Sequence, residues 1–106
     1  MKASVRAALQ DARRCLDEMY GDRLAHVVLY GSQARDDARE DSDVDVLVIL
    51  RDDFDVFAEI KRLTRLQLDL LERYGEDLSF QPFTEAEYRR RQSPLMINVR
   101  AESIEL

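Results

Sequence analysis

Two apolar segments in the first half of the chain constrain its fold most. Residues 24–30 and 44–50 are both rich in valine and leucine, and the second is apolar at every position except Asp45. A nearly continuous apolar run of this length is typical of a strand covered on both faces. We therefore expect residues 44–50 to form a strand of a sheet that carries other structure on each side.

Two longer segments show the spacing of amphipathic helices. Residues 3–20 repeat apolar side chains at intervals of three and four, and Gly21 follows as a helix stop. Residues 56–74 do the same and end before Gly75, with acidic candidates for the N-cap in the segment 52–55. The stripe expected to face the core comprises Val56, Ile60, Leu63, Gln67, Leu70 and Tyr74. A second group widens this stripe and suits either a broad core contact or a protein interface: Leu66, Leu68 and Leu71.

The remaining segments are shorter. Residues 78–83 predict a third strand, and Pro82 places it at a sheet edge because proline cannot donate to the ladder. Thr84 and Glu87 have the spacing of a capping box, which predicts a short helix after that strand. The tail, residues 94–106, is expected to be irregular or to form a short helix.

The order of these elements, α-β-β-α-β-α, predicts an α/β fold of the α+β kind, a small mixed β-sheet with helices packed on it. The chain has 106 residues, 45% of them hydrophobic, so we expect one domain over residues 1–106. The formal net charge of −6 argues against general nucleic-acid binding, which needs a basic face. No apolar run reaches membrane-spanning length and the N-terminus lacks a signal core, so the expected location is cytoplasmic.

The turn after the first strand has the chemistry of a phosphate site. Gly31 lets the backbone approach an anion closely, and the free N–H groups of a helix that starts there point at it. Ser32 adds a hydroxyl donor, and Arg35 lies about one helical turn further on. The pattern is not a Walker loop, because the Gly-x-x-x-x-Gly-Lys sequence is missing.

Two carboxylates stand at the start of the second strand. Asp43 and Asp45 are two residues apart, so strand alternation places them on one face while Val44 points to the other. Neighbouring carboxylates repel each other unless a cation lies between them, and oxygen ligands suit Mg²⁺ or Mn²⁺. The bland alternative is an acidic loop between two core strands. The complete pattern favours a two-metal site for phosphoryl or nucleotidyl transfer.

Residues 31–35, Gly-Ser-Gln-Ala-Arg, together with residues 41–48, Asp-Ser-Asp-Val-Asp-Val-Leu-Val, resemble the signature of the DNA polymerase β-like nucleotidyltransferase superfamily. The short chain resembles its minimal nucleotidyltransferase (MNT) branch, and the resemblance extends into the tail. The residue roles that it implies are triphosphate binding by Gly31 and Ser32, phosphate contact by Arg35, bracing of the loop by Ser42, and metal binding by Asp43 and Asp45.

The resemblance also implies a third carboxylate on a later strand, where it can bind metal and act as a base. This chain has Ser79 at the expected position. Asp77 lies two residues earlier and is our candidate substitute, although it could simply follow the turn at Gly75. This departure leaves open whether the chain is fully active.

By resemblance, we expect a Mg²⁺-dependent enzyme that transfers AMP from ATP to a hydroxyl group and releases pyrophosphate. The resemblance further implies a helical HEPN partner in a toxin–antitoxin pair, in which the antitoxin adenylylates a tyrosine of a HEPN ribonuclease toxin. One alternative acceptor is a small molecule, as in relatives that modify aminoglycosides. A different alternative is a catalytically impaired antitoxin that acts by binding alone. Homo-oligomers and hetero-oligomers are both open.

Three further features have structural and functional interpretations. Cys15, the only cysteine, lies on the apolar stripe of the first helix and is expected in the core. His26, the only histidine, is expected to be a packing or surface residue rather than a member of a triad. The basic run 89–91 suits a solvated helix end, with partner docking as the alternative.

Overall fold

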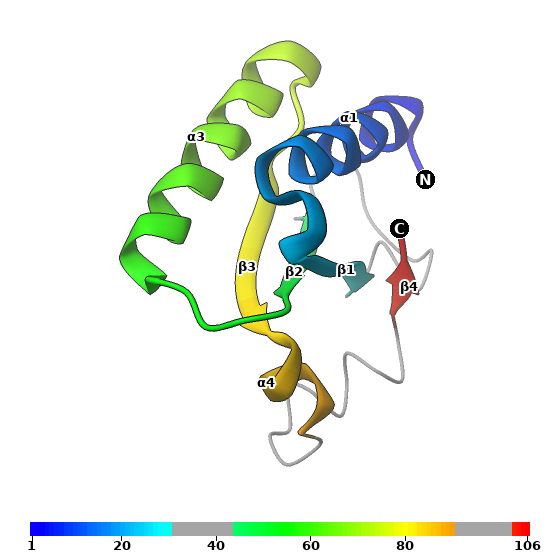
Figure 1. The fold of residues 1–106 in the computed structure, drawn as a ribbon. Coiled ribbons are helices and arrows are strands. Elements are labelled where there is room, and N and C mark those ends of the chain that lie inside the picture. The colour runs from blue at the N-terminus through cyan, green and yellow to red at the C-terminus, as the bar shows by residue number, and fades with distance from the viewer. Residues whose placement is uncertain (31–43, 91–102) are drawn as a thin grey trace.

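A four-stranded sheet forms the centre of the computed structural model, which describes residues 1–30, 44–90 and 103–106 (Figure 1). The order across the sheet is β3-β2-β1-β4. The strands are β1 (Leu24–Tyr30), β2 (Val44–Leu50), β3 (Leu78–Thr84) and β4 (Ile104–Glu105). Strand β1 is antiparallel to β2 and to β4, whereas β2 and β3 are parallel and are joined through a helix. The predicted mixed α+β architecture is confirmed.

Helices α1 (Ala3–Tyr20) and α3 (Val56–Tyr74) begin and end where the sequence predicts. Gly21 (φ +54°) follows α1 and opens a 3₁₀ turn, η1 (Gly21–Arg23). The Asp55 carboxylate accepts a hydrogen bond from the Ala58 N–H at 3.2 Å and caps the start of α3. Gly75 ends that helix in the left-handed region at φ +70°, which glycine adopts without steric cost.

The short helix α4 (Glu85–Arg89) follows β3 and has the predicted capping box. The Thr84 hydroxyl oxygen accepts from the Glu87 N–H at 3.1 Å, and the Glu87 carboxylate accepts from the Thr84 N–H at 3.0 Å. Pro82 lies in β3, which is an edge strand as expected. Figure 1 shows α1 and α3 on one side of the sheet and α4 at the far end of β3.

Strand β2 is buried on both faces, as its apolar sequence predicts. Val44, Val46 and Val48 pack with α1 and α3 in the main core. The alternate residues Leu47 and Ile49 pack with Val28 in a second cluster on the opposite face, and both are 0% exposed. Tyr30, Phe83 and Tyr88 of β1, β3 and α4 pack around that cluster. Asp45 shares this second face through strand alternation.

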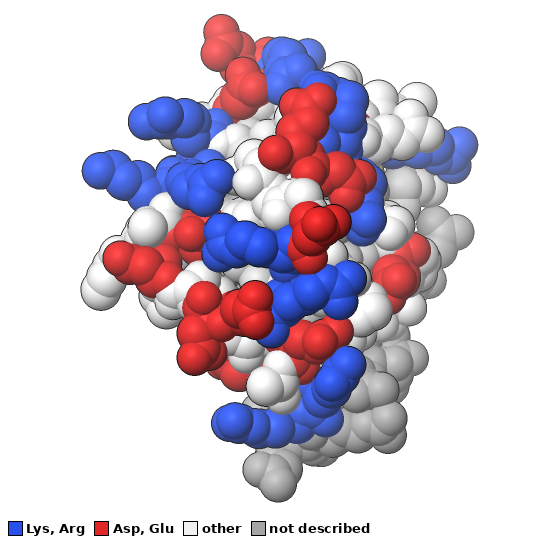
Figure 2. Space-filling view, viewed as in Figure 1, with Lys and Arg blue, Asp and Glu red and all other residues white. Residues whose placement is uncertain are grey.

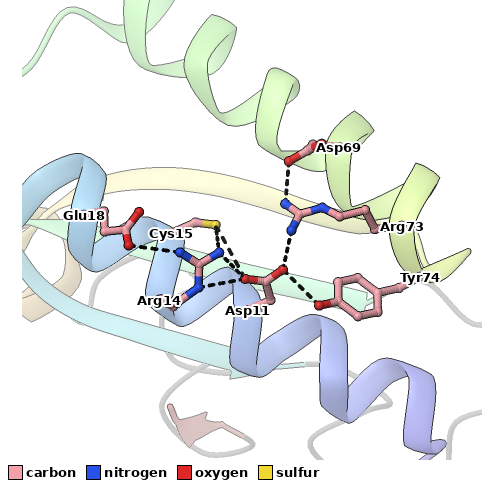
Figure 3. A network of polar contacts seen from close by, with 7 residues as sticks. All are labelled: Asp11, Arg14, Cys15, Glu18, Asp69, Arg73 and Tyr74. Carbon is pink, nitrogen blue, oxygen red and sulfur yellow. Dashed lines mark hydrogen bonds and ion pairs between the residues drawn. The ribbon is translucent and has the colours of Figure 1, made fainter.

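A network centred on Asp11 joins the two long helices (Figure 3). The Asp11 carboxylate accepts hydrogen bonds from Arg14 at 2.6 Å, from Arg73 at 2.7 Å and from the Tyr74 hydroxyl at 2.9 Å. Arg73 and Tyr74 belong to α3, so one carboxylate of α1 holds the end of the other helix. The hydrogen bond from Arg14 lowers the pKa of Asp11, and burial of the carboxyl opposes that shift only in part. Cys15 lies beside this network, half-buried at the edge of the core.

The stripe predicted for α3 is partly wrong. Val56 is 51% exposed and Ile60 is 46% exposed, whereas Glu59 and Leu66 are buried. The helix is rotated so that Glu59, Leu63, Leu66 and Leu70 face the core. Glu59 is tolerated there because Arg62 pairs with it at 3.2 Å.

The sequence also misses β4. Residues 104–105 form a two-residue strand beside Val28 and Leu29 of β1, where a helix or irregular tail was expected. The other described helices and strands match the predicted order, apart from the added turn η1. None of the helices in the described ranges carries the long apolar stretch that spanning a bilayer requires.

Candidate functional site

The predicted strand ends lie together at one end of the sheet. Strand β1 ends there at Tyr30, and the parallel strands β2 and β3 both begin there. In the ladder, Asp45 is paired with Tyr30 on one side and with Ser79 on the other. Neighbouring residues in register point to the same face of a sheet, so these side chains share one surface. Gln81, two residues after Ser79, lies on that surface as well.

Asp45 is half-buried on the face turned away from α1 and α3. Its negative charge affects its neighbour: burial raises the pKa of the Tyr30 hydroxyl, and the Asp45 carboxylate raises it further. A hydrogen bond with Gln81 opposes this shift. The candidate site therefore places the Asp45 carboxylate beside the Tyr30 phenol and the Ser79 hydroxyl, at the end of the sheet where β2 and β3 begin.

Most of the predicted phosphate and metal residues lie outside the described ranges. This group comprises Gly31, Ser32, Arg35, Ser42 and Asp43. Tyr30 and Val44 are the described residues on either side of the segment 31–43, and both lie at the end of the sheet that holds Asp45. The two ends of the segment 31–43 are therefore attached beside Asp45.

Asp77, the candidate third carboxylate, takes a different position from Ser79. It is exposed and directly precedes β3. Its Oδ1 accepts a hydrogen bond from Gln67 Nε2 of α3 at 2.6 Å. Because α3 covers the face opposite to Asp45, this bond directs Asp77 toward the helix layer. The structure thus places Ser79, and not Asp77, next to Asp45 in the ladder.

The Asp45 carboxylate at this end of the sheet provides the kind of oxygen ligand that a hard cation prefers. Carboxylate oxygens such as those of Asp45 are the ligands that Mg²⁺ prefers, with water and phosphate completing its shell. Within the described ranges, no group of three or more His, Cys, Asp or Glu side chains lies close enough to hold a metal ion. Asp43, the other predicted metal ligand, lies outside the described ranges.

The other residues that the sequence singled out lie elsewhere. His26 contacts Glu105 of β4 through Nδ1 at 2.8 Å and stacks near the ring of Tyr88. It packs between β4 and α4, as expected of a structural residue. Arg89 pairs with Glu85 within α4 at 3.3 Å, as in a solvated helix end. In Figure 2, Lys and Arg side chains are interspersed with Asp and Glu side chains over the described part of the visible face.

A family model for the nucleotidyltransferase domain matches residues 9–100, which include the Gly31-Ser32 turn, Asp43 and Asp45. The chain belongs to the nucleotidyltransferase domain family. This match spans most of the chain and confirms the superfamily resemblance that the motif indicates.

A curated relative of this nucleotidyltransferase comes from Methanocaldococcus jannaschii and is named a putative protein adenylyltransferase. The two are 34% identical over 53 residues, which cover 50% of this chain and 53% of the relative. The chain thus spans about half the length of the curated relative that it matches.

Solved structures share the fold. A putative minimal nucleotidyltransferase is 29% identical, with a TM-score of 0.62 over 100% of this chain and 97% of its own. A toxin–antitoxin with AMP-PNP is 19% identical, with a TM-score of 0.63 over 91% of this chain and 70% of its own. A chain in the structure of a tri-AMPylated Shewanella oneidensis HEPN toxin in complex with MNT antitoxin is 16% identical to this chain, with a TM-score of 0.52. The match covers 91% of this chain and 66% of that one.

Two residues on the surface around Asp45 were not singled out from the sequence, Tyr30 and Gln81. The signal for Tyr30 was its place as the last residue of β1, directly before Gly31. Gln81 could have been found by alternation from Ser79, because residues two apart in a strand share a face. The pairing of Tyr30 with Asp45 and the position of Gln81 beside Tyr30 could not be derived without the register between β1, β2 and β3.

Proposed function

We propose that this nucleotidyltransferase uses Mg²⁺ to transfer AMP from ATP to a hydroxyl group of a partner protein, and that the partner is a HEPN toxin. The observation that carries the proposal is the pairing of Asp45 with Tyr30, the residue directly before Gly31 and Ser32, at one end of the sheet. The curated relative's name and the AMPylated toxin in a structural neighbour support a protein acceptor. The AMP-PNP complex of another neighbour supports an adenosine nucleotide.

In this proposal, the turn and the strand start have separate roles. Gly31 and Ser32 bind the triphosphate through backbone N–H groups and a hydroxyl, Arg35 contacts phosphate, and Ser42 braces the loop. Asp43 and Asp45 hold the metal. When bound, Mg²⁺ neutralises phosphate charge and favours departure of pyrophosphate.

The reaction forms one bond and breaks one. The acceptor oxygen bonds to the α-phosphorus of ATP, the bond from that phosphorus to the bridging oxygen of the β-phosphate breaks, and pyrophosphate leaves. The acceptor proton goes to a base, for which the candidate is the carboxylate of Asp77, directly before β3. Its hydrogen bond to Gln67 would have to give way for Asp77 to reach the acceptor.

Label transfer tests the proposal. The protein is incubated with α-labelled ATP, Mg²⁺ and the HEPN-type protein encoded beside it, and label on that protein is measured. We expect transfer by the wild type, and loss in Asp43→Asn and in Asp45→Asn. Asp53→Asn is the matched control, because Asp53 is an exposed aspartate in the loop after β2. Transfer that persists in Asp45→Asn would contradict the assigned metal role.

One observation favours a second candidate, an antitoxin that acts by contact alone. Ser79 is the residue next to Asp45 in the ladder, where the superfamily resemblance implies an acid. If the wild type neutralises its partner without labelling it, and Asp45→Asn neutralises it equally well, this second candidate is correct and the transfer proposal fails. Ser79→Asp then becomes informative, because a restored acid should produce measurable transfer.

A further inference from the structure

Helix α3 carries a second apolar face that does not touch the core. Phe57 is 87% exposed, Leu68 is 60% exposed, and Ile60 and Leu71 are 46% and 41% exposed. Together with exposed Thr64, these residues follow one another at intervals of three and four along the helix. We name this set, Phe57, Ile60, Thr64, Leu68 and Leu71, the outer stripe.

Spacing of this kind aligns side chains along one side of a helix, as in a coiled-coil seam. The buried residues of α3, Leu63 and Leu70 among them, face the sheet and α1 instead. Figure 1 shows α3 at the margin of the molecule. Leu68 of the outer stripe also lines an open groove that α3 forms with Cys15 and Met19 of α1. The outer stripe runs from Phe57 to Leu71, about 21 Å along the helix axis at a rise of 1.5 Å per residue, and is a candidate interaction surface.

The charges beside the outer stripe indicate what covers it. Lys61 and Arg65 lie along one flank in the first part of α3, and Glu72 lies along the same flank near its end. These three side chains form no ion pair with any other residue in the described ranges. In a parallel pair related by a two-fold axis, the charged flank of one copy would face the opposite flank of the other, where Gln67 lies, so Lys61 and Glu72 would not meet. An antiparallel one would bring Lys61 of each copy opposite Glu72 of the other.

The side-chain sizes agree with the same arrangement. When Lys61 faces Glu72, Ile60 meets Leu71 of the other copy, and the small Thr64 meets the larger Leu68. A two-fold axis generates each of these contacts twice. We propose that a second copy of this chain packs antiparallel against α3 through the outer stripe. The assembly is independent of the proposed transfer reaction.

The expected dimer is weak. A single helix pair buries less than the roughly 800 Å² per partner of a standard interface, so the association should depend on concentration. Sedimentation equilibrium on the wild-type chain should therefore show a reversible monomer–dimer mixture. A chain that stays monomeric at its highest soluble concentration would overturn the proposal.

Apolar variants test the seam. Phe57→Glu and Leu68→Glu should each weaken dimerisation by on the order of a hundredfold, because each buries a charge in the seam. Both positions are exposed, so the thermal midpoint should be unchanged and shows that the variants fold. Arg6→Glu is the control, since Arg6 is an exposed residue of α1 beside β4. Dimerisation that is unaffected by both stripe variants contradicts the proposal.

Charge reversal tests the orientation. Lys61→Glu and Glu72→Lys should each weaken the dimer by on the order of tenfold, and mixing the two variants should restore association as a heterodimer. The double variant Lys61→Glu/Glu72→Lys should self-associate like the wild type, because each exchanged residue again faces an opposite charge in the antiparallel pair. A stripe that binds a helical partner protein, while the chain alone is monomeric, would identify a different occupant and overturn the proposal.

Discussion

Two aspartates in this molecule occupy opposite kinds of environment. Asp11, in the helix layer, is surrounded by donors of its own fold, two arginines and the Tyr74 hydroxyl. Asp45, at the start of the central strand β2, is paired in the ladder with Tyr30 and Ser79, whose side chains are uncharged. Burial raises the pKa of Tyr30, and the charge of Asp45 raises it further. Asp11 joins the two long helices, whereas Asp45 lies at the strand start beside the segment that carries the predicted phosphate and metal residues.

The comparison predicts that the two aspartates separate activity from stability. Asp45→Asn should lower nucleotidyl transfer by about a thousandfold, because it removes a carboxylate from the site where charge develops, while stability changes by no more than about 0.5 kcal/mol. Asp11→Asn should leave transfer unchanged. Label transfer and thermal unfolding are measured on both variants. Loss of transfer in Asp11→Asn with the fold intact would remove the distinction.

The largest effect on stability is expected from truncating the neutralised carboxylate. Asp11→Ala should lower the free energy of unfolding by about 2 kcal/mol, which is about 10 °C in Tm, because Arg14, Arg73 and Tyr74 lose a shared acceptor. Asp17→Ala is the matched control. Asp17 is 53% exposed and pairs with Arg13, so its removal should cost less than about 0.5 kcal/mol. Equal losses in chemical denaturation would show that the network does not join α1 to α3.

A smaller change tests one bond of that network. Tyr74→Phe removes only the hydroxyl that donates to Asp11 at 2.9 Å, and should lower the free energy of unfolding by about 1 kcal/mol. In a double-mutant cycle with Asp11→Ala, the two effects should not add, because the hydroxyl and the carboxylate share one interaction. Full additivity would mean that Tyr74 acts through packing alone.

The smallest effect concerns acid. The pKa of Asp11 is held below its ordinary value of 3.8, chiefly by the hydrogen bond from Arg14. A lowered pKa in the folded state means that the stabilisation is present above 3.8 and is lost as the pH falls through the lowered value. The stability difference between wild type and Asp11→Asn should therefore shrink from about pH 5 to about pH 2. A constant difference over that range would contradict the assignment.

Local patterns were enough to predict much of the fold. The bounds of α1 and α3 followed from apolar spacing and from Gly21 and Gly75, which end the two helices. The rotation of α3 did not follow, because its sequence has two apolar faces and only packing decides which one is buried. Strand β4 was missed because two residues carry no readable alternation, and their pairing with β1 is a long-range contact.

The candidate site divides in the same way. The motif predicted that Asp45 begins a strand with its carboxylate on a separate face from Val44, and the ladder agrees. The roles of Gly31, Ser32 and Asp43 stay predictions. The difference between Ser79 and Asp77 depends on where β3 begins and on the bond to Gln67, neither of which sequence spacing specifies.

Pro82 has a consequence for the behaviour of the protein at high concentration. A strand that joins an existing sheet needs an uninterrupted row of N–H donors at its edge, and proline breaks that row in β3. The opposite edge is formed by β4, which has only two residues. Within the described residues, Pro82 therefore makes the β3 edge a poor template for the addition of a strand from another copy.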